Sequence, residues 1–242
     1  MLNPSFVTLK MPIIIYLFGG DNINQTRSLY LKSRSVYTED CVKTFLDICA
    51  VHVAEFFPGA NTGTVNNARG ACFEMFFEEI VNRLIRTLHL KLTLKKLPNS
   101  SKDVIFNLLS DEVAQNYKKV ISELSLENLS LYFSNPDYML YSGDLDNPHP
   151  SNVVCLFSIK SSLRSDRRYQ LLHEANTIKW ICSQIDISPL AFNIVSCNIN
   201  RIDYEVFDFV HTGNGASIRA VDNVIDFHSG NYFDDIIKVI VK

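Results

Sequence analysis

The segment from Val153 to Lys160 constrains the fold of this chain more than any other. It reads Val-Val-Cys-Leu-Phe-Ser-Ile-Lys, a run of strand length that is apolar on both faces until near its end. Such a run is typical of a strand inside a sheet that is covered on two sides. Because side chains alternate between the faces of a strand, we expect Ser158 and Lys160 to point the same way. The segment predicts a central strand with two polar side chains on one face at its carboxyl end.

A second, shorter strand is expected at residues 138–141, Tyr-Met-Leu-Tyr. The intervening residues 142–150 are rich in Gly, Asp, Asn and Pro, which form turns. We therefore expect the two strands to pair as an antiparallel hairpin. Asp137, at the start of one strand, would then lie beside Lys160, at the end of the other.

An amphipathic helix is expected after this hairpin, from about Ser165 to Cys182, with Ser165 as its N-cap. The apolar residues that recur at helical spacing are Leu171, Ala175, Ile178 and Cys182. Arg167 and Glu174 are seven residues apart and share nearly one face. The helix is expected to carry Arg167 outward and to return Glu174 toward Lys160.

Two carboxylates and a lysine around one point suit hydrolysis of a phosphodiester with Mg²⁺. Carboxylate oxygens from Asp137 and Glu174 are hard ligands for a divalent ion, which lowers the pKa of an attacking water. Lys160 would orient that water or offset developing charge. Alone, a Pro-Asp pair or a Ser-Ile-Lys tripeptide is an ordinary structural feature. Their order on the expected elements favours a catalytic role.

These residues resemble the PD-(D/E)XK nuclease superfamily, and within it the type II restriction endonucleases that cut sites built on CCGG, the group that includes NgoMIV and SgrAI. In that group serine commonly replaces the acidic residue before the lysine, and a glutamate on the next helix takes over at the metal. Ser158 stands at the replaced position, and Glu174 follows Lys160 with residues 161 to 173 intervening. The resemblance implies that Ser158 shapes the site rather than reacting.

The resemblance also assigns a base-reading element. The group carries Arg-x-Asp-Arg after the lysine, and Arg164-Ser165-Asp166-Arg167 stands at that place. Arginine can donate two hydrogen bonds to guanine, and a carboxylate can accept one from cytosine N4. Arg168 and Lys179 are expected to add positive charge and to contact phosphates. Their alternative interpretation is a solvated helix face.

A long amphipathic helix is expected from Gly63 to about Leu88, with Glu74 on its small and apolar side. Relatives often carry a glutamate on an early helix that completes the metal site, so Glu74 is expected as a third metal ligand and Glu78 as its substitute. A buried carboxylate needs a partner or a metal. An ion pair, with Arg69 as one partner, is the alternative role of Glu74.

One departure from the CCGG group concerns the hairpin. Only 22 residues, 138 to 159, separate Asp137 from Lys160, a spacing closer to relatives that cut CCNGG or CCWGG sites. Those relatives differ after the lysine, with an uninterrupted Arg-Glu-Arg, so a CCGG core is favoured. A repair or junction-resolving nuclease of the same superfamily, or a noncatalytic DNA-binding or protein-interaction domain, is the rival interpretation.

The rest of the chain is consistent with one restriction-endonuclease-like domain over residues 1–242, of the α/β (α+β, mixed sheet) class. A mainly helical part is expected at 1–100 and a nuclease core at 101–242, divided near the loop at 99–101. Further helices are expected at 38–57, 111–124 and 232–241, strands at 190–199 and 204–210, and a strand or core segment at 12–18. A palindromic site predicts a homodimer, with pairing of dimers into a tetramer left open.

Charge and cysteine content narrow the setting. The net charge of −3 excludes a general polycation, so double-stranded DNA would meet a local concentration of positive charge. The six cysteines form no C-x-x-C pair and mostly sit in apolar segments, which favours buried thiols in a reducing cytoplasm. The apolar run at 12–18 is too short to span a membrane.

Overall fold

The structure is a computed structural model, and it describes residues 62–97, 106, 109–123, 136–146, 148–197, 199–208, 210–213, 216–227 and 232–241. The chain divides into two compact units, Met1–Glu79 and Ile80–Lys242. Each unit is described by itself, and the expected single domain stays a prediction. The segments expected at 12–18 and 38–57, and the loop at 99–101, lie outside the described residues.

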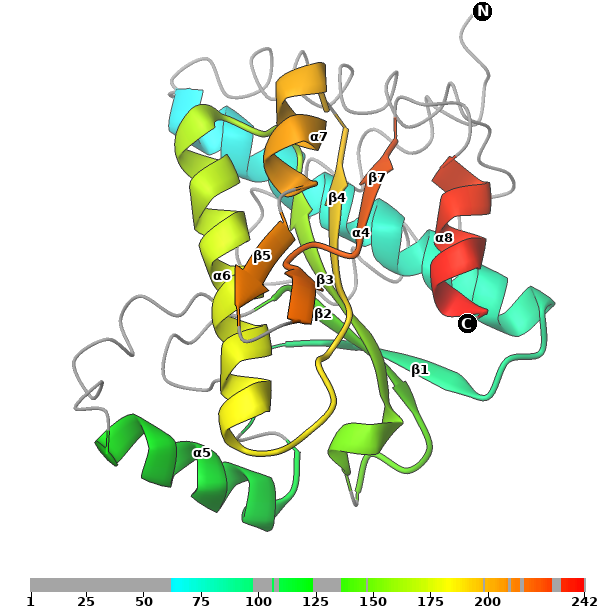
Figure 1. Cartoon of the computed structure of the whole chain (residues 1–242). Coiled ribbons are helices and arrows are strands. Elements are labelled where there is room, and N and C mark those ends of the chain that lie inside the picture. The colour runs from blue at the N-terminus through cyan, green and yellow to red at the C-terminus, as the bar shows by residue number, and fades with distance from the viewer. Residues whose placement is uncertain are drawn as a thin grey trace, which may run out of the picture. The chain divides into compact units, whose positions relative to one another are not determined.

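The second unit is built on a mixed five-stranded sheet (Figure 1). Its strands are β1 (Leu92–Lys96), β2 (Tyr138–Ser142), β3 (Val153–Lys160), β4 (Phe192–Ser196) and β7 (Asn223–Asp226), in that spatial order. The pairs β1–β2 and β2–β3 are antiparallel, whereas β3–β4 and β4–β7 are parallel. The expected hairpin and the mixed sheet are confirmed. Because β1 precedes residue 101, the sheet begins before the predicted division of the chain.

Strand β3 is central, and helix α6 (Ser165–Gln184) packs on one of its faces. The residues that form this layer of the core include Leu171, Ala175, Ile178 and Cys182 of α6, Met139 and Tyr141 of β2, Leu156 of β3, and Ile194 of β4. Figure 1 shows α6 and helix α8 (Tyr232–Ile240) on opposite sides of β4 and β7. The apolar character of β3 on both faces follows from its place in the sheet.

Helix α6 begins one residue earlier than expected. Its N-cap is Arg164, which makes no side-chain cap hydrogen bond, so Ser165 is the first helical residue and not the cap. At the other end Asp186 adopts a φ of 56°, and the N–H of Ile187 donates to the carbonyl of Cys182 at 3.0 Å. A left-handed residue with this backbone bond is a common way to end a helix.

Most of the expected helices are confirmed: α4 (Thr62–Thr87), α5 (Asp111–Glu123) and α8. The strand expected at 190–199 is present as β4. The strand expected at 204–210 is wrong, because helix α7 (Arg201–Phe207) occupies most of it. The short 3₁₀ helix η3 (Pro150–Asn152) lies in the β2–β3 connection, and β5 (Val210–Gly213) pairs with β6 (Ala216–Arg219) in a separate ribbon.

The reason for α7 is its amino-terminal cap. The side chain of Asn200 accepts the N–H of Asp203, and the side chain of Asp203 accepts the N–H of Asn200. This reciprocal pair satisfies two backbone N–H groups at the start of the helix. In a strand these groups would need partners on a neighbouring strand. The segment therefore begins as a helix in spite of its Tyr, Val and Phe residues.

Three cysteines of the described part are buried thiols outside any disulfide, as expected: Cys155, Cys182 and Cys197. Burial raises the pKa of Cys182 to about 11, so its thiol stays protonated at neutral pH. No helix among the residues that the structure describes is long and apolar enough to cross a membrane.

Candidate active site

Asp137 and Lys160 lie together, as the hairpin predicts. Asp137 immediately precedes β2, where its N–H donates to Phe157 at 2.8 Å and its carbonyl accepts from Leu97 at 3.0 Å. Its Oδ2 accepts Lys160 Nζ at 2.9 Å and the backbone N–H of Ile159 at 2.5 Å. The side chains are 16% and 25% exposed. The carboxylate is thus fixed by its own backbone and by two donors of β3, while remaining in reach of solvent.

Ser158 and Lys160 lie on the sheet face that α6 covers. Leu156, two residues before Ser158, belongs to the core layer shared with α6, and alternation puts the three side chains on one face. Met139 of β2 belongs to the same layer, which places Asp137 on this face as well. The active-site face predicted for the hairpin therefore points toward α6.

Glu174 is 6% exposed, on the apolar side of α6 between Leu171 and Ala175. That side packs on the sheet face that carries Asp137 and Lys160. A carboxylate is seldom buried in such a layer without a charged or metal partner. The helix therefore directs Glu174 inward and leaves Arg167 exposed, as the seven-residue spacing predicts.

Ser158 is fully buried, and its Oγ makes no hydrogen bond to any residue that the structure describes. In the parallel pairing of β3 and β4, Ser196 lies next to Lys160, and Ser196 is also fully buried. A small side chain at position 158 keeps space beside the lysine that a glutamate would fill. This position fits the expected role of Ser158 in shaping the site.

The donors at this site suit Mg²⁺ in kind, because Asp137 and Glu174 offer carboxylate oxygens. Within the described residues Oδ1 of Asp137 accepts no hydrogen bond, since both donors use Oδ2. The expected third ligand, Glu74, is half-buried on α4 in the first compact unit, as is its substitute Glu78. No three His, Cys, Asp or Glu side chains of the described residues gather at one point. The contribution of Glu74 stays a prediction.

The expected base-reading residues form an exposed turn at the start of α6. Arg164 Nη2 donates to Asp166 Oδ2 at 2.9 Å, with the side chains 68% and 61% exposed. Arg167 Nη1 donates to Gln170 Oε1 at 2.9 Å, also on the surface. Desolvation alone would raise the pKa of Asp166, but the hydrogen bond and charge of Arg164, helped by backbone N–H groups, hold it below its usual value. Asp166 is therefore an ionised acceptor at neutral pH.

Two residues expected at phosphates have internal partners instead. Arg168 Nε donates to Asp203 Oδ1 in an ion pair whose side chains are 15% and 0% exposed. Lys179 is 6% exposed and donates to the carbonyl of Arg219 and, at 2.7 Å, to Asp222. The expected place of both on a positively charged surface is corrected: these ion pairs tie α6 to α7 and to the segment before β7.

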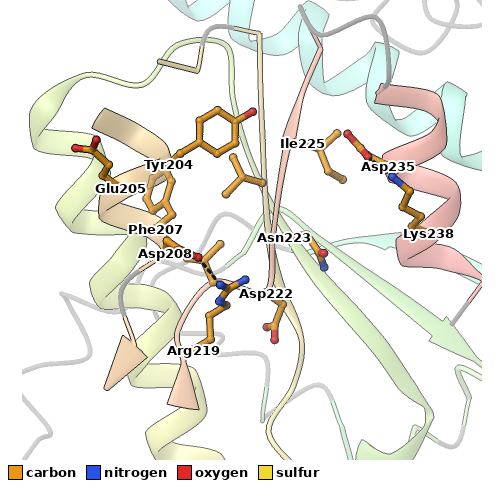
Figure 2. Close-up of a pocket in the computed structure, with 12 residues that line it drawn as sticks. Tyr204, Glu205, Phe207, Asp208, Arg219, Asp222, Asn223, Ile225, Asp235 and Lys238 are labelled. Carbon is orange, nitrogen blue, oxygen red and sulfur yellow. Dashed lines mark hydrogen bonds and ion pairs between the residues drawn. The ribbon is translucent and has the colours of Figure 1, made fainter. Parts of the chain in front are cut away.

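A pocket of about 510 Å³ lies at the edge strand β7, between α7 and α8 (Figure 2). Its acidic groups pair with basic ones: Asp208 with Arg219, Asp235 with Lys238, and Asp222 with Lys179. Partial burial, followed by the charges of Asp226, Asp235 and Asp203, raises the pKa of Tyr204 in its wall. The sequence did not indicate this pocket, and its paired charges give it no evident part in the chemistry of Asp137 and Lys160.

The geometry of this site agrees with comparisons to known proteins. Residues 139–242 match the model of a family described as Cfr10I/Bse634I restriction endonuclease. This part of the chain, somewhat less than half of it, is therefore similar to that family. The matched region contains Ser158, Lys160, Glu174 and the exposed turn of α6, and it starts two residues after Asp137. The finer placement beside NgoMIV and SgrAI stays a prediction.

Individual members of the family are distant in sequence. The chain is 21% identical over 151 residues to the Type II restriction enzyme Cfr10I of Citrobacter freundii, a match that covers 60% of this chain and 53% of that enzyme. The matched part thus spans about half the length of this relative.

Solved structures of the Bse634I restriction endonuclease share the fold. A crystal structure of the Type IIF enzyme Bse634I with cognate DNA has a TM-score of 0.69 at 18% identity, covering 86% of this chain and 88% of that one. A second Bse634I structure has a TM-score of 0.62, also at 18% identity, covering 84% and 86%. The restriction-endonuclease-like fold expected from the sequence is confirmed.

Proposed function

We propose that this protein is a type II restriction endonuclease that cuts both strands of DNA, with Mg²⁺, at a palindromic site with a CCGG core. The observation that carries the proposal is the contact between Asp137 and Lys160 at the end of β3, with Glu174 buried on the helix that covers them. The family match over residues 139–242 and the shared fold support it.

In this proposal Asp137 and Glu174, with Glu74 as a third ligand, would hold Mg²⁺, and the bound ion would lower the pKa of water and offset charge on the scissile phosphate. Lys160, which Asp137 holds in place, would face the reacting phosphate, orient the attacking water and stabilise developing negative charge. Ser158 leaves room beside Lys160. A covalent serine step has no support, since no described group accepts the proton of its Oγ.

The exposed turn at the start of α6 is proposed to read bases. Arg164 and Arg167 would donate to guanines, and Asp166, which stays ionised, would accept from cytosine N4. The Arg164–Asp166 contact holds both side chains out from the helix before DNA arrives. A repair nuclease needs the carboxylates and the lysine but has no need of this turn, which favours the sequence-specific enzyme.

The assembly is proposed to be a homodimer. One subunit carries one such turn and can address half of a two-fold symmetric site, so a symmetric dimer is the simplest reader and cuts both strands. Pairing of dimers into a tetramer is a further possibility of the same proposal. The mass of the enzyme bound to a duplex tests it, and a strict monomer on DNA contradicts it.

The test of function is digestion of a plasmid of known sequence with Mg²⁺, followed by sequencing of the ends. We expect a small set of discrete fragments whose ends all fall at CCGG, and no cutting when EDTA removes the metal. Ends at CCNGG or CCWGG sites would move the chain to that specificity. Ends without a common sequence would leave a nuclease of another role.

A further inference from the structure

The N-cap residue of the turn proposed to read bases gives no side-chain cap. Arg164 occupies the N-cap position without a side-chain bond to the backbone donors of the helix; its guanidinium donates to Asp166, and its carbonyl accepts the N–H groups of Arg167 at 3.0 Å and Arg168 at 3.1 Å. A helix end without such a cap frays more readily. The position of this turn therefore depends on contacts with neighbouring parts of the fold.

Arg168 differs from Arg164 and Arg167, because its side chain is only 15% exposed while theirs reach into solvent. Its Nε donates to Asp203, whose side chain is fully buried at the start of α7. Helices α6 and α7 pack against each other at this point. The same turn thus presents three side chains outward and is tied inward by one.

Asp203 is itself fixed. Its Oδ2 accepts the N–H of Asn200 at 2.8 Å, and its own N–H donates to the Asn200 side chain at 3.1 Å. One oxygen therefore completes the cap of α7 while the other receives Arg168. Removing the charge of Asp203 would leave a buried guanidinium without its counter-ion, which is costly in a protein interior.

We propose that Asp203 is a positioning residue for sequence discrimination, and this inference rests on the proposed function. Through Arg168 it fixes the first turn of α6, so that Arg164, Asp166 and Arg167 meet base edges at hydrogen-bonding distance. Bidentate contacts to guanine tolerate little displacement. Asp203 is fully buried and bonds to Arg168 and Asn200, so its loss should act on the choice of sequence more than on hydrolysis.

The test compares Asp203→Asn, which keeps the shape of the side chain and removes its charge, with Glu205→Gln on the same helix. Glu205 pairs with Arg201 on the surface, where both side chains are mostly exposed. The measurement is the ratio of kcat/KM on a CCGG duplex to kcat/KM on the same duplex with one base pair changed. We expect Asp203→Asn to lower this ratio by about 10- to 100-fold, as small misplacements do, and Glu205→Gln to leave it unchanged.

This ratio separates positioning from mere stability. Loss of folded enzyme lowers both rates alike and leaves their ratio at the wild-type value. A thermal melt identifies an Asp203→Asn protein that does not fold, in which case Arg168→Lys decides, because it keeps a cation for Asp203 but loses the guanidinium geometry. We expect Arg168→Lys to lower the ratio by a smaller factor.

Two different failures are distinguishable. A wild-type enzyme without preference for any sequence overturns the proposed function. A selective wild-type enzyme whose selectivity is unchanged in both Asp203→Asn and Arg168→Lys overturns the positioning role and leaves the proposed function standing.

Discussion

The end of the sheet that is proposed to be catalytic and the first turn of α6 are organised in opposite ways. Asp137 and Lys160 are mostly covered, and the carboxylate is held by β3 as well as by its own backbone. Arg164 and Asp166 are mostly in solvent and hold mainly each other. Preorganised groups in a water-poor site stabilise charge strongly, whereas side chains that read a groove must reach out. In the proposed function, the buried pair would supply rigidity for the reaction and the exposed turn would supply reach for recognition.

The largest expected effect is at the covered site. Asp137→Ala or Lys160→Ala should lower the single-turnover cleavage rate by at least about a thousandfold, because each removes a group that acts on the charge of the transition state. Binding to the CCGG duplex, measured by gel shift, should persist. Lys119→Ala, at an exposed lysine, is the matched control and should cut normally. Full activity in either site variant contradicts the assignment.

The next effect is at the exposed turn. Arg167→Ala should lose about 1 to 3 kcal/mol of discrimination between a CCGG duplex and one with a changed base pair, the worth of one bidentate contact. Equilibrium binding to the two duplexes measures it. The comparison between the regions fails if Arg164→Ala, Asp166→Ala and Arg167→Ala all cut the same sites at the wild-type rate.

A smaller effect is expected from Lys179. Its side chain is buried and belongs to neither of the two regions. Lys179→Met should lower the free energy of unfolding by about 1 to 2 kcal/mol, because Asp222 loses its partner but keeps partial contact with water. The salt dependence of DNA binding should stay as in the wild type. A flatter salt dependence with unchanged stability would restore the phosphate contact expected from the sequence.

The smallest effect sets the baseline for these measurements. Glu123→Gln breaks the exposed i,i+4 pair with Lys119 and should change the free energy of unfolding by at most about 0.5 kcal/mol. Urea unfolding of this variant beside Lys179→Met measures the contrast. An equal loss in both variants would mean that burial adds nothing to the Lys179 pair.

The sequence predicts the hairpin and α6 well because their signals are local. The apolar run of β3 and the turn residues before it determine where Asp137 meets Lys160, and helical spacing determines that Glu174 turns inward. Strand β1, Leu-Thr-Leu-Lys-Lys, is too short and too polar for such a signal. It forms because β2 offers a full set of backbone partners.

The sequence-based predictions are wrong mainly where a side chain is paired with a residue far away in the chain. A lysine on a helix is ordinarily solvated, and Lys179 is buried because Arg219 and Asp222, 40 and 43 residues later, satisfy its ammonium. Arg168 likewise meets Asp203 across 35 residues. For α7 a local signal did exist, since Asn200 and Asp203 have the spacing of a capping pair, but the expected strand at 204–210 did not take it into account.

The short connection between β3 and α6 limits where such an enzyme cleaves. Only residues 161–163 separate Lys160 from Arg164, so their Cα atoms lie at most about 14 Å apart even in a fully extended chain. Successive base pairs of duplex DNA are about 3.4 Å apart along its axis. The side chains of Lys160 and Arg164 add to the distance between their Cα atoms, but the phosphate that Lys160 is proposed to face and the base that Arg164 is proposed to contact would still lie within about one helical turn of each other. An enzyme of the proposed kind cuts inside or directly beside its recognition sequence, and not a full helical turn away.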